Sequence, residues 1–264
     1  MNDAKPPAIP RPAATILLLR DGTEGLEVFM VVRHHQIDFA AGALVFPGGR
    51  VEDADHALAV NVAPDGTHLP SFRIAAIRET FEECGVLLAR PRGANAIIDT
   101  DILKRLDDRF RTKLNAGTID FDAVLAAEDL EPALDHLVHF AHWITPANQP
   151  KRYDTQFFLA QAPAAHLAVH DGYEAVESIW IRPADALAGT EAGRYKLVFA
   201  TAKNLEKLAR FPTAAAAIDA ARSARVVTVE PQPIRLEGTK RLLRIPAEAD
   251  YGGSEFIVDF PPAS

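Results

Sequence analysis

The sequence lacks the residues that several classes of protein depend on. Its 264 residues include a single cysteine, Cys84, which excludes an intrachain disulfide framework and a cysteine metal site. No apolar run reaches the length of a transmembrane helix, and the first residues lack the apolar segment of a signal peptide. We therefore expect a cytoplasmic protein with no membrane partner, in which Cys84 is a small core residue.

Positive charge is also scarce. The chain carries 28 Lys and Arg against 36 Asp and Glu, a net charge of −8, and it has no basic run. Proteins that hold nucleic acid through its phosphates gather lysine and arginine on one surface, so we expect no nucleic-acid partner. An anionic small-molecule substrate would need a metal ion or a few placed arginines.

What the sequence does contain is enough apolar surface for a core and a mixture of element types. Hydrophobic residues make up 48% of the chain. Strand-like runs and helical segments are interspersed without regular alternation, which indicates an α/β or α+β fold built in layers. The expected strands are 14–20 and 26–33, paired as a hairpin, then 42–50, 137–146, 152–161 and 176–183. The expected helices are 71–84, one starting at Pro183, 196–211 and 214–224, with a helical insert at about 91–137.

The stretch RETFEECGV places three glutamates, Glu79, Glu82 and Glu83, within five positions. It lies in an amphipathic helix whose apolar residues share the opposite face, with Ser71 as the expected N-cap and Gly85 as the expected C-terminal residue. Like charges at these spacings repel by about 0.2–0.5 kcal/mol per pair on an exposed helix. Two interpretations remain open: a solvated helix face, or a site where a divalent cation such as Mg²⁺ relieves the repulsion.

Together with the upstream FPGGRVEDAD, this stretch resembles the Nudix box, written G-x5-E-x7-R-E-U-x-E-E-x-G-U with U a bulky apolar residue. The residues in register are Arg78, Glu79, Glu82, Glu83, Gly85 and Val86, and Thr80 stands where an apolar residue is usual.

The first half of the box is looser. Counted from Gly49, its first acidic position is Asp55, which is shorter than glutamate, and Glu52 and Asp53 are nearby alternatives. Residues 56–77 then separate Asp55 from the arginine, fifteen more than the box has. We therefore expect an insertion at about 56–70 in the loop before the helix.

The resemblance implies a fold and an organisation of the chain. The fold is the Nudix α/β/α sandwich with a mixed β-sheet, here with a helical insert and C-terminal helices. The resemblance implies a Nudix hydrolase domain at 11–190, containing the insert at about 91–137. Residues 191–264 would form a C-terminal helical extension and tail packed on that domain. As a hypothesis, the insert and the tail cap the substrate cleft or form a homodimer contact.

The resemblance also implies an activity: hydrolysis of a nucleoside diphosphate linked to another moiety, with Mg²⁺ or Mn²⁺ as cofactor. The metal ligands of the family carry over to Glu79, Glu82 and Glu83, plus a backbone carbonyl at Gly48 or Gly49. Arg78 would make an orienting ion pair within the box. The partner is then a small-molecule nucleotide diphosphate.

The substrate is less closely indicated. The similar branch includes the peroxisomal coenzyme A diphosphatases of animals and many bacterial relatives. Arg33 and the motif G-x3-F-P-G-G from Gly42 fit a coenzyme A signature of a related branch, but Asp38 stands where a second arginine is expected. The alternatives are an ADP-ribose or NADH pyrophosphatase and a non-catalytic nucleotide-binding regulator. The presence of Glu82 and Glu83 argues against the regulator.

Residues outside the box give weaker indications. Arg33 or Arg152 would contact phosphate, and Tyr153 or Phe46 would stack on adenine. An equally good interpretation makes Arg152 a surface ion pair and Phe46 a core residue.

A general base is also needed. Glu174 or Glu177 precede or begin an expected strand that lies near the site in many Nudix folds, and either could act as the base. Solvated carboxylates would leave the same pattern in the sequence.

Overall fold

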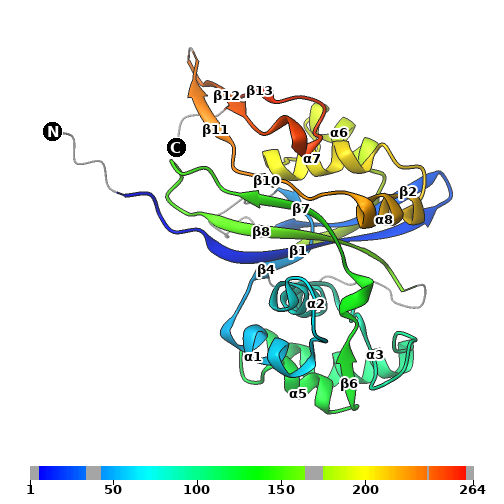
Figure 1. The fold of residues 1–264 in the computed structure, drawn as a ribbon. Helices are drawn as coiled ribbons and strands as arrows, with labels where there is room; N and C mark the ends of the chain where they lie inside the picture. The colour runs from blue at the N-terminus through cyan, green and yellow to red at the C-terminus, as the bar shows by residue number, and fades with distance from the viewer. Residues whose placement is uncertain (1–5, 34–42, 164–174, 237, 260–264) are drawn as a thin grey trace.

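A mixed eight-stranded sheet forms the centre of the protein (Figure 1). The computed structural model describes residues 6–33, 43–163, 175–236 and 238–259. The strand order is β10-β7-β8-β1-β2-β3, with β4 paired to β1 and β9 paired to β2. β1–β8 and β10–β7 are parallel pairs, and the others are antiparallel. The strands are β1 (Arg11–Gly22), β2 (Gly25–Arg33), β3 (Leu44–Val45), β4 (Gly48–Arg50), β7 (Val138–Ile144), β8 (Tyr153–Gln161), β9 (Ala175–Ile181) and β10 (Thr228–Val229).

β1 lies in the middle of the sheet and is buried on both faces. Ile16 and Leu18 point into one core cluster, whereas Leu17 and Leu19 point into the other. A strand covered on both sides needs apolar side chains at successive positions, which explains the unbroken ILLL run. β1 turns back at Gly22 to pair with β2, so the predicted hairpin is confirmed.

Helices cover both faces of this sheet (Figure 1). One side carries α1 (Asp53–Val62), α2 (Pro70–Cys84), α3 (Thr100–Leu106) and α5 (Phe121–Ala126); the other carries α6 (Pro183–Glu191), α7 (Phe199–Leu208) and α8 (Ala214–Ser223). Each side has its own hydrophobic cluster, and Cys84 is fully buried in the one beneath α2. The predicted three-layer α/β/α arrangement is confirmed. Within the described ranges, no helix combines the length and apolar character needed to cross a bilayer.

The segment between α2 and β7 forms a layer beneath α2. Its two ends meet in a short antiparallel pair, β5 (Ala89–Pro91) with β6 (Leu130–Pro132), which was not predicted from the sequence. Between them lie α3, a π-helical turn η1 (Asp107–Arg111), α4 (Thr112–Asn115) and α5, and the 3₁₀ turn η2 (Leu134–His136) leads into β7. Apolar side chains of this segment join the core cluster that α2 contributes to.

The C-terminal residues form a second small sheet that contacts α7 and the main sheet. Its strands are β11 (Gln232–Arg235), β12 (Lys240–Arg244) and β13 (Glu255–Asp259), with the 3₁₀ turn η3 (Ala247–Ala249) after β12. The Trp143 indole of β7 donates a hydrogen bond to the Tyr251 hydroxyl (2.9 Å), which donates to Asn204 Oδ1 of α7 (2.8 Å). These bonds tie the tail to the sheet, while the domain division at residue 190 stays a prediction.

Two details of the α1–α2 region differ from the sequence-based expectation. The first half of the expected loop insertion at 56–70 is helix, because α1 runs from Asp53 to Val62, and the loop is confined to the residues between Val62 and Pro70. The N-cap of α2 is Leu69 in the left-handed conformation (φ 52°), not Ser71, and Pro70 takes the first helical position, where its missing N–H costs nothing. Gly85 ends α2 in the left-handed conformation (φ 65°), as predicted.

His139 of β7 lies near the start of α2. Its ring contacts those of His68 (5.4 Å between centroids) and Phe158 (5.5 Å), and Nε2 is 2.8 Å from Gln156 Oε1. Burial lowers the pKa of His139 to about 4, and the nearby His68 acts in the same direction against the hydrogen bond with Gln156. Between about pH 4 and pH 6.5, the folded protein therefore keeps this histidine neutral, whereas an unfolded chain would protonate it.

We expect the free energy of unfolding to fall as the pH drops from about 6.5, the pKa of an unfolded histidine, toward about 4, since the unfolded chain takes up the proton first. Replacing His139 by glutamine should remove part of this slope. Urea denaturation at several pH values measures it, with His56→Gln on the exposed side of α1 as control. Identical slopes in wild type and His139→Gln would contradict the assignment.

Candidate functional site

The two glycines of β4 allow three elements to approach closely. β4 pairs with β1 so that Gly48 lies opposite Thr15 and Gly49 opposite Ala14. A Cβ atom on Gly48 would lie 2.4 Å from the Ala14 carbonyl oxygen, and one on Gly49 would lie 2.3 Å from Glu79 Oε1. The contact with the β1 backbone excludes a larger residue at Gly48, and a side chain at Gly49 would displace the Glu79 carboxylate.

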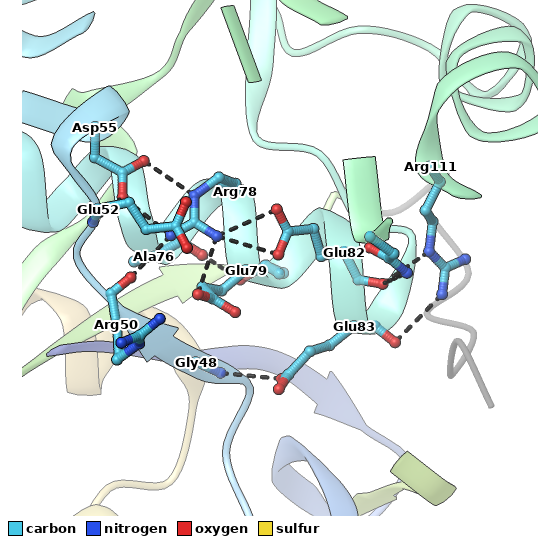
Figure 2. Close-up of polar contacts among 12 residues, drawn as sticks. Gly48, Arg50, Glu52, Asp55, Ala76, Arg78, Glu79, Glu82, Glu83 and Arg111 are labelled. Carbon is cyan, nitrogen blue, oxygen red and sulfur yellow. Dashed lines mark hydrogen bonds and ion pairs between the residues drawn. The ribbon is translucent and has the colours of Figure 1, made fainter. Parts of the chain in front are cut away.

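The acidic side of α2 faces the protein rather than the solvent. Glu79 and Glu83 are 9% and 4% exposed. Glu83 Oε2 accepts a hydrogen bond from the Gly48 backbone N–H at 3.0 Å, which Figure 2 shows. The solvated-face interpretation is therefore wrong for these two glutamates.

Arg78 lies at the centre of the carboxylate groups (Figure 2). Its Nε and Nη2 donate to the two oxygens of Asp55, each at 3.0 Å, and Nη2 also donates to the Arg50 carbonyl oxygen at 2.8 Å. Its Nη1 donates to Glu79 Oε1 at 3.0 Å and to Glu82 at 3.1 and 3.2 Å. A guanidinium has five N–H donors, and this one uses them to join α1, α2 and β4. We call Asp55, Arg78, Glu79, Glu82 and Glu83 the carboxylate cluster.

Asp55 has a well-defined place in spite of its short side chain. It is 1% exposed at the third position of α1, where its side chain accepts the Glu52 N–H at 2.9 Å and completes a capping box. Because α1 and α2 pack together, Asp55 reaches Arg78 across the inserted residues. The nearby alternatives, Glu52 and Asp53, are both exposed.

The electrostatics of the cluster show an excess of negative charge. Burial alone would lower the pKa of Arg78, but the hydrogen bond with Asp55 and the charges of Glu79 and Glu82 outweigh it and raise the pKa above its usual value. The pKa of Glu82 is also raised, first by burial and then by the charges of Glu52 and Asp55, in spite of the opposing effect of Arg78. A cation would be favoured here.

The donor set of the cluster fits a hard divalent cation. Its glutamates and aspartate offer carboxylate oxygens, and none of the described residues that line the surrounding cleft is a histidine or cysteine. Across the described ranges, no group of three or more His, Cys, Asp or Glu side chains is gathered as metal ligands. Glu79 and Glu82 instead bond to Arg78, and Glu83 bonds to Gly48. An ion bound here would thus share these carboxylates with Arg78 and Gly48.

A cleft of about 970 Å³ opens over the cluster. Its floor includes Gly48, Gly49, Arg78, Glu79 and Glu82. The walls come from the segment after η1, from β7 and β8, and from the C-terminal residues; they include Leu114, Asn115, Ile119, Phe121, Trp143, Tyr153, Phe199, Thr201 and Leu243. Insert and tail therefore both contribute walls, whereas a homodimer contact stays a prediction.

The remaining sequence-predicted residues divide into three groups. Tyr153 and Phe46 line the cleft, although Phe46 is only 4% exposed and belongs to the core. Arg152 does not line it: the guanidinium donates to the carbonyl oxygens of Thr145 and Ala8 and to Glu230, and so ties the N-terminal arm to the tail. Outside the described residues lie Gly42, Asp38 and Glu174, and the structure describes only the backbone of Arg33 and Glu177.

Several polar residues near the cluster were not predicted from the sequence. Arg50 and Lys151 line the cleft and bring positive charge to it. Arg111 and Asn115 reach the end of α2 from the insert. Nothing in the local sequence separates these side chains from other basic and polar residues.

A second cleft, of about 920 Å³, lies at the opposite end of α2 and contains none of the cluster. Two of the arginines that line it, Arg73 and Arg90, are committed to the fold, whereas Arg222 is exposed. Arg73 donates to the carbonyl oxygens of His68, Leu134 and Leu137, and Arg90 pairs with acidic side chains of the β6 region. The cleft over the carboxylate cluster is therefore the better functional site.

Comparison with known proteins shows similarity to Nudix hydrolases. Residues 58–198 match the NUDT19 Nudix domain family. The chain is 31% identical over 190 residues to nudix hydrolase 7 of Caenorhabditis elegans (71% of this chain, 56% of that protein). It is 25% identical over 211 residues to the acyl-coenzyme A diphosphatase NUDT19 of Xenopus laevis (64% and 56%). The chain thus spans little more than half the length of these curated relatives.

The fold of this chain is similar to a solved structure over most of both chains. The crystal structure of a NUDIX hydrolase from Alicyclobacillus acidocaldarius is similar with a TM-score of 0.70 and 29% sequence identity. The similarity covers 80% of this chain and 96% of that one. The three-layer arrangement of this chain is therefore shared with a known NUDIX hydrolase.

Replacing Asp55 by asparagine should destabilise the protein by about 3–5 kcal/mol, because it leaves Arg78 charged and buried with its main partner neutralised. Urea denaturation measures this loss. Asp53→Asn is the control, since it makes the same change at an exposed position of α1 and should stay within about 0.5 kcal/mol of wild type. Equal losses in the two variants would show that the Arg78–Asp55 pair does not hold the site together.

Proposed function

Because this chain belongs to the Nudix hydrolases, in the branch of the coenzyme A diphosphatases, we propose that it cleaves the diphosphate bond of coenzyme A or acyl-coenzyme A. The observation that carries this proposal is the carboxylate cluster around Arg78 at the floor of a large cleft (Figure 2). Such a cluster suits the hydrolysis of an anionic diphosphate when a bound cation offsets the negative charge of the carboxylates.

The proposal includes a divalent cation, Mg²⁺ or Mn²⁺. Glu79, Glu82 and Glu83 would hold it, together with a backbone carbonyl at Gly48 or Gly49. When bound, such an ion neutralises phosphate oxygens and lowers the pKa of a bound water. Two observations support this assignment: the side-chain donors are all carboxylates, and Glu79 and Glu82 line the floor of the cleft beside Gly48 and Gly49.

The protein's own residues have distinct roles in this proposal. Arg78 orients Glu79 and Glu82, and the Gly48 N–H orients Glu83. Arg50 and Lys151 would bind phosphate oxygens of the diphosphate, because cationic side chains form charge-assisted hydrogen bonds with phosphate. The base that activates water stays assigned to Glu174 or Glu177 as a proposal from the sequence.

The shape of the cleft supports a substrate with one polar and one apolar part. Its volume, about 970 Å³, is at the upper end of typical ligand sites. Apolar side chains, among them Ile119, Phe121 and Phe199, stand across from the charged floor. The diphosphate would lie on the floor, the adenine against Tyr153 or Phe46, and the pantetheine arm or acyl chain along the apolar walls.

Purified protein with Mg²⁺ or Mn²⁺ should convert coenzyme A to phosphopantetheine and 3′,5′-ADP, as seen by mass spectrometry. Replacing Glu82 by glutamine should lower kcat by about 100-fold or more, because a charge that acts on the reacting groups is removed. Glu191→Gln, an exposed position on α6, is the matched control and should keep full activity.

Other outcomes of that assay distinguish the alternatives. The panel would also contain acetyl-coenzyme A, ADP-ribose, NADH and nucleoside triphosphates. Cleavage of ADP-ribose or NADH alone would overturn the coenzyme A assignment and keep the hydrolase. Nucleotide binding without turnover of any substrate would favour the regulator.

Mg²⁺ should raise the melting temperature relative to EDTA, because an ion that binds only the folded cluster stabilises it by about 2.7 kcal/mol at one hundred times its Kd. Differential scanning calorimetry of wild type and Glu82→Gln measures the shift, which the variant should largely lose. The same melting temperature in Mg²⁺ and EDTA would speak against an ion in this cluster.

A further inference from the structure

Arg111 connects the insert to the end of α2. It is the last residue of the π-helical turn η1 and is 9% exposed. Its Nε donates to the Glu82 carbonyl oxygen at 3.0 Å and its Nη2 to the Glu83 carbonyl oxygen at 3.3 Å (Figure 2). A buried guanidinium from a separate segment thus bonds to the backbone of two residues whose side chains belong to the carboxylate cluster.

The bonded carbonyls belong to the last turn of a helix. The final four C=O groups of an α-helix have no partner within the helix. α2 ends at Cys84, so the carbonyls of Glu82 and Glu83 are among these groups. Asn115 Nδ2 also donates to the Glu82 carbonyl oxygen at 3.3 Å. Arg111 and Asn115 together satisfy the end of α2, and the positive charge of Arg111 is favourable beside the negative end of the helix dipole.

The guanidinium of Arg111 is held on its other sides as well. Asp107, one turn earlier, accepts a hydrogen bond from Nη1 at 3.0 Å. A Cβ atom on Gly85 would lie 2.9 Å from Nη1, so the left-handed residue that ends α2 packs directly against this group. Arginine suits such a place because its planar fork of donors is rigid. The last turn of α2 is therefore fixed by a rigid contact.

We propose that Arg111 is a positioning residue that holds the last turn of α2, and with it the carboxylates of Glu82 and Glu83, in place for a divalent cation. This inference rests on the proposed metal-dependent function. The same segment continues through Leu114 and Asn115 to Phe121, which line the cleft. Arg111 thereby also fixes one wall of the cleft relative to the cluster.

The contact can be removed without dissolving the segment that carries it. Leu106, Leu114 and Phe121 pack into the core beneath α2, and the β5–β6 pair closes the segment at its base. Loss of Arg111 should therefore loosen the last turn of α2 while the fold persists. This separates a positioning role from a general structural one.

The direct test is Mn²⁺ binding, measured by isothermal titration calorimetry or by the electron paramagnetic resonance signal of free Mn²⁺. Arg111→Met should weaken binding by about 10-fold or more, the loss typical of residues that orient metal ligands. Arg111→Lys, which keeps the charge and can reach one carbonyl, should lie between it and wild type. Arg105→Met is the matched control, because Arg105 is an exposed arginine of the same segment that pairs with Glu128.

Two further readouts distinguish this role from simple destabilisation. In EDTA, hydrogen exchange of the amides at 82–86 should rise in Arg111→Met and not in Arg105→Met. With metal and substrate, kcat should fall at saturating substrate while KM changes little. If Arg111→Met does not fold, Arg111→Lys carries the same measurements.

The outcomes separate this inference from the proposed function. Wild-type Mn²⁺ affinity and unchanged exchange in folded Arg111→Met would overturn the positioning role and leave the hydrolase in place. A wild-type protein that binds no Mn²⁺ and cleaves no diphosphate would overturn the proposed function, and the role of Arg111 in ion binding with it.

Discussion

The buried guanidinium of Arg78 is the interaction on which the rest of the site depends. It donates to Asp55 on α1, to the Arg50 carbonyl of β4, and to Glu79 and Glu82 on its own helix. Buried charges are costly to desolvate, and they persist only when their partners are well placed. The three elements that surround the cluster are therefore held in one arrangement, which leaves Glu79 and Glu82 at the floor of a cleft.

The parts of the chain outside the box complete this site in two ways. The insert places Arg111 and Asn115 on the end of α2, and residues 114–121 on the wall of the cleft. The tail adds Leu243 to the opposite wall and is tied to the sheet through Tyr251. In the proposed function the cluster recognises the charged part of the substrate, and these walls would select the group attached to the diphosphate.

Local patterns predicted most elements, and long-range contacts explain the failures. α2 was predicted because its apolar spacing and Gly85 are local signals. α1 was missed because its buried residues, Asp55 and Ala59, do not make an apolar stripe. Arg152 resembled a phosphate ligand, yet it bonds to Ala8 and Glu230, which are far away in the sequence. No local rule predicts such partners, because they depend on how the layers pack.

By itself, the sequence determined which charged groups lie together on about one and a half turns of α2. The spacing of Arg78, Glu79, Glu82 and Glu83 places one cation among three anions wherever that helix forms, since helix geometry sets neighbours three and four residues apart. Only the tertiary structure decided which distant groups meet them. Asp55 meets Arg78 because α1 packs against α2, and Arg111 meets the end of α2 because η1, in the insert at 91–137, packs there. That packing depends on burial over the whole layer rather than on any local pattern.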